Sequence, residues 1–212
     1  MRSRASYSNS VFINCPFDDE YRHLQNAMVF AIYDCGFVPR CTLEENDGSA
    51  TRADKIHRLI QNSGYGIHDI SRTEQDLMNG LPRFNMPLEL GLFLGAKRYG
   101  DAEQKKKIVL ILDREKYRYQ KFISDISGQD IRSHGGAAES LIRQVRDWLS
   151  DASQKKTIPG AKSITGRYSH FSRDLPGMCA DEDIAIDEIT YNNYSYFITE
   201  WLRKVSGVYL SR

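Results

Sequence analysis

Hydrophobic runs at strand spacing alternate with stretches at helical spacing over the first 150 residues of the chain. The pattern predicts four buried strands, at residues 11–14, 37–41, 65–70 and 107–113. The last is the clearest, because five consecutive aliphatic residues are typical of a central parallel strand covered on both faces. The second is the weakest, because Pro39 removes a hydrogen-bond donor from the ladder.

Helical periodicity fills the intervals between these strands and returns near the end of the chain. The predicted helices lie at about 19–35, 52–60, 85–96, 141–149 and 187–205. Thr51 and Asp54 resemble a capping box at the start of the second helix. A polar loop is expected from Ser71 to Phe84. The helix over 85–96 is apolar nearly all round, so we expect it to be buried.

Alternating strands and helices are typical of an α/β fold with a parallel sheet, here of about four to five strands flanked by helices. We assign residues 1–150 to this α/β domain. Residues 150–180 are polar and contain Pro and Gly, which predicts an extended connection. Residues 151–212 then form an appendage whose C-terminal helix, with an aromatic side, packs on the core or on a partner.

The composition narrows the class of protein without naming a function. The 212 residues are 41% hydrophobic and 27% charged, as in a soluble globular protein, and the net charge is +1. That balance gives no global attraction to nucleic acid, so we expect none to be bound directly. No apolar run reaches the length of a membrane span. Four cysteines without Cys-x-x-Cys spacing favour a reduced, cytoplasmic protein with no metal site.

Several common catalytic motifs are missing from the sequence. No Gly-x-Gly-x-x-Gly follows the first strand, and no Gly-x-x-x-x-Gly-Lys-Ser/Thr occurs, which argues against a nicotinamide-dependent dehydrogenase and a P-loop phosphotransferase. There is no Gly-x-Ser-x-Gly elbow of a serine hydrolase. His-x-x-x-His metal spacing is also absent.

Polar residues instead gather where the predicted strands end. In an open parallel sheet, ligands bind at the carboxyl ends of the strands. Glu89 lies one turn into the helix after the third strand, and it is the only charge between Arg83 and Lys97. A carboxylate in such an apolar segment is costly unless it is paired or used. The residues that the strand ends contribute are Asn14, Phe17, Arg40, Asp69 and Arg72.

Two carboxylates at this edge favour chemistry on a sugar. Breaking the bond between a ribose and a nucleobase passes through an oxocarbenium-like state, which a carboxylate stabilises or attacks. Glu89 is the candidate for that role, and Asp69 for orienting sugar hydroxyls or assisting protonation of the base. Arg40 or Arg72 would hold a phosphate. Asn14 and Phe17 would wall the base or sugar.

Other interpretations of these residues stay open from the sequence. His68 alternates with Asp69, so one of the two faces away from the site, and His68 is the active partner if the strand turns early. Cys15 is a second candidate nucleophile. Glu89 also fits an ordinary helix start, where the macrodipole favours acidic residues. Asp69 fits a strand-end cap, and the arginines fit surface ion pairs.

Three segments resemble the nucleoside 2-deoxyribosyltransferase-like superfamily and the related TIR domains. They are Phe12–Phe17, the strand ending in Asp69, and Pro87–Gly91. Over residues 11–113 the resemblance implies a Rossmann-like (flavodoxin/TIR-like) fold with Glu89 as the catalytic residue. It implies cleavage of an N-glycosidic bond in NAD or a nucleoside or nucleotide, with no further cofactor. Residues 82–86 depart from both families' patterns, which leaves donor and acceptor open.

Two function hypotheses follow. The first is an N-glycosidase or transferase acting on NAD or a nucleoside or nucleotide, by analogy with bacterial effectors of antiviral defence. The alternative is a non-catalytic nucleotide-sensing or TIR-like assembly module in a larger complex, which the aromatic C-terminal segment favours. Either one is expected to form homo-oligomers or to join a hetero-complex.

Overall fold

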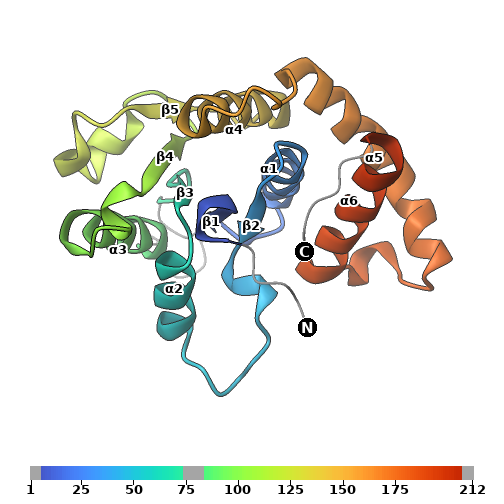
Figure 1. The fold of residues 1–212 in the computed structure, drawn as a ribbon, viewed down its shortest axis with the longest axis horizontal. Coiled ribbons are helices and arrows are strands. Elements are labelled where there is room, and N and C mark those ends of the chain that lie inside the picture. The colour runs from blue at the N-terminus through green and yellow to red at the C-terminus, as the bar shows by residue number, and fades with distance from the viewer. Residues whose placement is uncertain (1–5, 74–83, 207–212) are drawn as a thin grey trace.

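The fold is built on a five-stranded, all-parallel sheet with the strand order β2-β1-β3-β4-β5 (Figure 1). The computed structural model describes residues 6–73 and 84–206. The predicted Rossmann-like α/β fold is therefore confirmed, while the predicted loop over 71–84 lies largely outside the described residues. The strands are β1 Ser10–Asn14, β2 Val38–Arg40, β3 Tyr65–Asp69, β4 Ile108–Asp113 and β5 Ile131–Ser133.

Helices cover both faces of this sheet. In Figure 1, α2 and α3 lie on one face, and α1 and α4 lie on the other with α5 and α6 beyond α1. None of the helices in the described ranges combines the length and apolar character needed to cross a bilayer. The helices are α1 Arg22–Asp34, α2 Arg52–Gln61, α3 Asn85–Tyr99, α4 Ala138–Ser153, α5 Ala161–Asp181 and α6 Tyr191–Ser206.

The strand order creates a switch point beside β1. This strand pairs with β2 on one side and with β3 on the other, and Asn14 at its end is in register with His68. The chain therefore leaves β1 in one direction to form β2 and crosses to the other side to form β3. A crevice opens at the carboxyl ends of strands at such a point, and it is the usual ligand site of open α/β sheets.

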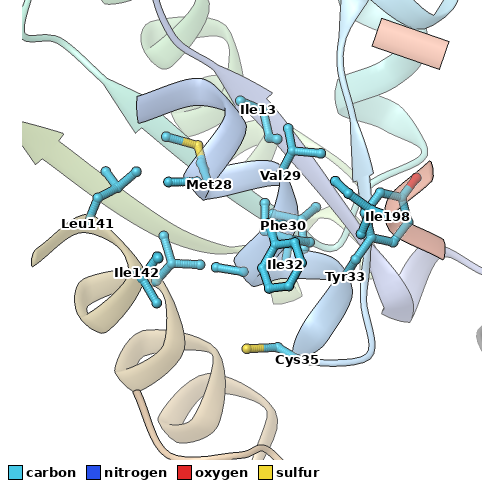
Figure 2. Close-up of a cluster of buried hydrophobic side chains, with 14 of the residues drawn as sticks. Ile13, Met28, Val29, Phe30, Ile32, Tyr33, Cys35, Leu141, Ile142 and Ile198 are labelled. Atoms are coloured by element: carbon cyan, nitrogen blue, oxygen red, sulfur yellow. The ribbon is translucent and has the colours of Figure 1, made fainter. Parts of the chain in front are cut away.

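The main hydrophobic core surrounds α1. Figure 2 shows Met28, Phe30 and Ile32 of this helix among Leu141 and Ile142 of α4 and other buried side chains from the sheet and α6. Because α1 is enclosed by the sheet on one side and by helices on the others, nearly its whole surface is buried. Cys15 and Phe17, which follow β1, pack with this same cluster.

The prediction of an extended connection over residues 150–180 was wrong. Most of this segment is the 21-residue helix α5. Its buried residues Ile164, Phe171 and Cys179 recur at intervals of seven and eight, which is two helical turns. The polar residues between them and Pro176 within the helix masked this period. The core cluster that contains α1 also contains residues of α5 and α6, so the C-terminal segment packs on the core.

Truncating Phe171 tests whether α5 belongs to this core. Its ring is fully buried beside Phe30 and Trp201. We expect Phe171→Ala to lower the free energy of unfolding by about 3–5 kcal/mol, because it leaves a cavity in a packed aromatic cluster. Urea denaturation measures the change, with exposed Arg173→Ala on the same helix as the control. Equal midpoints for the two variants would show that α5 is only loosely attached.

The expectation that α3 is buried all round holds on one face only. Leu90 and Phe93 are fully buried, whereas Leu88 is 62% exposed and Tyr99 is 86% exposed. The reason is architectural: α3 lies in an outer layer, so the face turned away from the sheet is exposed to solvent (Figure 1). The N-cap half of the predicted capping box at α2 is confirmed, because Thr51 Oγ1 accepts a hydrogen bond from the Asp54 N–H at 3.1 Å. The Asp54 carboxylate accepts from the Thr51 hydroxyl at 2.7 Å.

Candidate active site

Asn14 joins the end of β1 to the start of α3. Its Nδ2 donates to the Met86 carbonyl at 2.8 Å and contacts His68 Nδ1 at 3.0 Å, and the side chain is buried. The amide nitrogen is thereby fully used inside the protein. Asn14 fixes the first turn of the helix that carries Glu89, which is a positioning role beside the predicted one of walling the substrate.

Glu89 is a nearly buried carboxylate with little of its hydrogen-bonding capacity used. Its side chain is 8% exposed, and its charged partner among the described residues is Arg52, with Nη2 3.6 Å from Oε1. That separation is too long for a good hydrogen bond. Burial raises the pKa of Glu89 and Arg52 opposes the rise in part. The carboxylate is therefore held at the switch-point edge with oxygen lone pairs available to a ligand.

Asp69 is held in the opposite way, by a full set of donors. Its two oxygens accept from the Tyr21 hydroxyl, the Ser71 hydroxyl, the Ser71 N–H at 2.9 Å and His134 Nε2 at 3.0 Å. Burial, followed by the charge of Asp69, raises the pKa of Tyr21 well above its usual value, so the phenol stays protonated and donates. A carboxylate that accepts four hydrogen bonds has no lone pair left for a sugar hydroxyl.

Ser71, His134 and Asp69 are the residue types of a hydrolase triad, but their hydrogen bonds exclude that role. His134 Nδ1 accepts from the Gly136 N–H at 3.0 Å, so the proton of the neutral ring lies on Nε2. The same Nε2 faces both Ser71 Oγ, at 3.0 Å, and Asp69. A nitrogen that carries a proton has no lone pair with which to activate Ser71.

The two acidic residues approach the edge of the sheet from opposite faces. Asp69 contacts Tyr21 and His134 on the α1 side, whereas the neighbouring residue His68 packs against Phe93 of α3. Cys15 directly follows β1 and is buried. Burial, followed by the charge of Asp69, raises the pKa of its thiol well above the usual value. The thiol is therefore protonated, which argues against Cys15 as a nucleophile.

His68 is a neutral core residue. Its ring is fully buried beside the rings of Phe12 and Phe93, and its Nε2 has no hydrogen-bond partner. Burial, with a smaller effect of Lys107, lowers the pKa of His68 to about 3. A ring that is not protonated above this pH cannot serve as a general acid near neutrality, so the geometry does not support His68 as the active partner.

The two arginines predicted to hold a phosphate both carry close carboxylate partners. Arg40 Nε contacts the two carboxylate oxygens of Glu44 at 2.8 and 3.0 Å. Arg72 pairs with Asp18 at 3.0 Å and with Glu20. A phosphate at either arginine would have to displace a carboxylate that is paired at 3.0 Å or less. Phe17 is half-buried and packs against the main core rather than lining the edge as a free platform.

Three residues of this edge were not predicted from the sequence: Tyr21, Arg52 and His134. Arg52 had a usable signal, because the capping box at Thr51 begins a helix that must start at the carboxyl edge of β2. His134 follows β5, which is too short to stand out in the sequence. Over the described ranges, no three His, Cys, Asp or Glu side chains are grouped as metal ligands would be.

Comparison of the chain with protein-family models and with curated proteins finds no match. The resemblance to nucleoside 2-deoxyribosyltransferases and TIR domains therefore rests on the short sequence segments quoted above alone.

Proposed function

We propose that the protein cleaves the N-glycosidic bond of NAD or of a nucleoside or nucleotide, with Glu89 as the catalytic carboxylate. The observation that supports this most is the contrast between two buried carboxylates at one switch-point edge. Asp69 is saturated with hydrogen bonds, whereas over residues 6–73 and 84–206 the one charged contact of Glu89 is the long one with Arg52. Burying such a carboxylate costs free energy, and use in catalysis accounts for that cost.

In the proposed reaction the bond between C1′ of the ribose and the base nitrogen breaks, and its electron pair leaves with the base. Positive charge develops on C1′ and the ring oxygen. Glu89 stabilises this charge electrostatically while water or an acceptor bonds to C1′, or Glu89 itself attacks C1′ to form an ester that water or an acceptor then displaces. Asn14 holds the helix that carries Glu89. Tyr21, Ser71 and His134 hold Asp69 on the α1 side of the same edge.

The pH dependence of activity is a first test of this role. Glu89 acts only when ionised, so activity falls as pH drops through its pKa. Because burial raises that pKa above the usual 4.5, the loss begins at higher pH than for an exposed glutamate. Arg52→Ala removes the opposing charge and moves the midpoint higher still. Rates measured from about pH 4 to 8 check this, and an acid limb unmoved in the variant would contradict it.

The proposal is tested by incubating the purified protein with NAD, NADP, nucleosides and nucleotides and measuring released base by chromatography. Release of free base from at least one class supports it. Whether the sugar passes to water or to a second base is decided by adding an acceptor base and looking for a new nucleoside. No release from any member of the panel would count against the enzyme and favour the sensing module.

The alternative of a non-catalytic assembly module has less support, because most of the aromatic side chains of α6 pack inside the molecule. Tyr194, Phe197 and Trp201 are buried in the main core, and Trp201 Nε1 donates to Asp174 at 2.8 Å, whereas Tyr196 is 42% exposed. A single partly exposed tyrosine does not make an aromatic surface for a partner. Oligomerisation, a larger complex and a part in antiviral defence stay predictions, as does the absence of a further cofactor.

A cytoplasmic location is also part of the proposal. All four cysteines are free and buried. Free thiols are typical of proteins in reducing compartments. NAD and nucleotides are intracellular metabolites, so the proposed substrates agree with this location.

A further inference from the structure

We infer that Arg52 binds a phosphate group of the substrate, so that the site prefers nucleotides to nucleosides. The inference rests on the proposed function of Glu89, because it places the phosphate on the same ribose whose C1′ faces that carboxylate. Arg52 thus takes the phosphate-binding role that the sequence predicted for Arg40 or Arg72.

Arg52 is placed at the candidate site by two elements. It is the first residue of α2, and this helix follows β2, so its N-terminus lies at the carboxyl edge of the sheet. The packing of α2 against α3 brings the guanidinium to 3.6 Å from Glu89 Oε1. The Arg52 side chain is nevertheless 55% exposed. It therefore spans the distance between a nearly buried carboxylate and solvent.

The charge of Arg52 is less fully compensated than the charges of the three other arginines considered for this edge and for α2. Arg40 and Arg72 each have a carboxylate oxygen at 3.0 Å or less. Arg58, on the same helix, pairs closely with Glu45. Among the described residues, the charged partner of Arg52 is Glu89 alone, at the long distance given above, and a guanidinium has five N–H donors. Within that part of the chain most of its donors are left for a ligand, and the fork geometry suits the oxygens of a phosphate.

The position of Arg52 next to Glu89 favours a phosphate carried by the same ribose as the reacting carbon. A ribose 5-phosphate unit carries its anionic group and its reacting carbon on one small ring. A site with a cation next to the reactive carboxylate attracts the phosphate while the carboxylate faces the developing positive charge on the ring. A nucleoside has no anionic group for Arg52, so it would lose this interaction and keep the rest.

The experiment compares matched substrates that differ only in phosphate, such as nicotinamide mononucleotide with nicotinamide riboside and inosine monophosphate with inosine. It uses the wild type, Arg52→Ala, Arg52→Lys and the control Arg58→Ala, at about pH 8, where carboxylates are ionised. We expect the wild type to prefer the phosphorylated member by about 10- to 100-fold in kcat/KM. Arg52→Ala should lose that preference, Arg52→Lys should keep part of it, and Arg58→Ala should keep all.

Two results would overturn the inference. One is equal use of both members of each pair by the wild type. The other is a fall in Arg52→Ala that is the same for both members, which would mean that Arg52 acts only through Glu89. Thermal melting of each variant shows that the comparison concerns folded protein.

A binding measurement distinguishes failure of the inference about Arg52 from failure of the proposed function. If the wild type releases no base from any substrate, calorimetry with ribose 5-phosphate and ribose still tests Arg52. We expect ribose 5-phosphate to bind the wild type, to bind Glu89→Gln more tightly because a repelling charge is removed, and not to bind Arg52→Ala. Equal weak binding of ribose and ribose 5-phosphate to all three proteins would contradict the inference.

Discussion

Glu89→Gln is expected to reduce base release by about 10³-fold or more. The amide has almost the same shape as the carboxylate but has no negative charge to stabilise the oxocarbenium-like state and no nucleophilic oxygen. The substitution also removes a buried charge, so we expect the variant to melt at or above the wild-type temperature. Initial rates of base release, together with thermal melting, measure both effects.

A matched control comes from α4. Glu139 lies in the first turn of that helix, is exposed, and has only a long contact with Arg143. We expect Glu139→Gln to keep wild-type activity within about twofold, since a surface substitution of this kind has little effect. If both variants kept the wild-type rate, Glu89 would not be the catalytic group.

Asp69→Ala is expected to lower the free energy of unfolding by about 3–5 kcal/mol. The carboxylate is fully buried and accepts hydrogen bonds from Tyr21, Ser71 and His134. Its removal leaves their donors without acceptors in a region closed to water. Urea denaturation followed by circular dichroism gives the change.

Asp130→Ala is the control for this loss, because its side chain is 82% exposed and its contact with Arg132 is long. We expect a change within about 0.5 kcal/mol. A stable but inactive Asp69→Ala protein would mean that Asp69 takes part in the chemistry. Its hydrogen-bond network would then not be needed for stability. An unstable protein would assign Asp69 to the framework.

Much of the sheet was predictable because central parallel strands carry a strong local signal. The aliphatic run of β4 and the strand ending in Asp69 were both recognisable from their residues alone. β5 was not, because three residues leave no pattern. α5 was missed because few apolar residues, far apart, mark its buried side.

The candidate site was predictable in part, and the rest depended on packing. Glu89 stood out as a charge in an apolar run. Its contact with Arg52 required α2 and α3 to pack side by side, which no local pattern encodes. The topology predicted that Glu89 and Asp69 lie together. Neighbouring strand residues alternate, however, so Asp69 faces the α1 side while His68 faces α3, the helix that carries Glu89. The contact of His134 with Asp69 depends on β5, the short strand that His134 follows.

The most direct test of the central claim is the rate at which free base appears when the wild type and Glu89→Gln are incubated in parallel with the NAD and nucleotide panel. The account predicts a product peak that grows with time for the wild type and stays at the enzyme-free background for the variant. Equal growth of the peak with both proteins would contradict it.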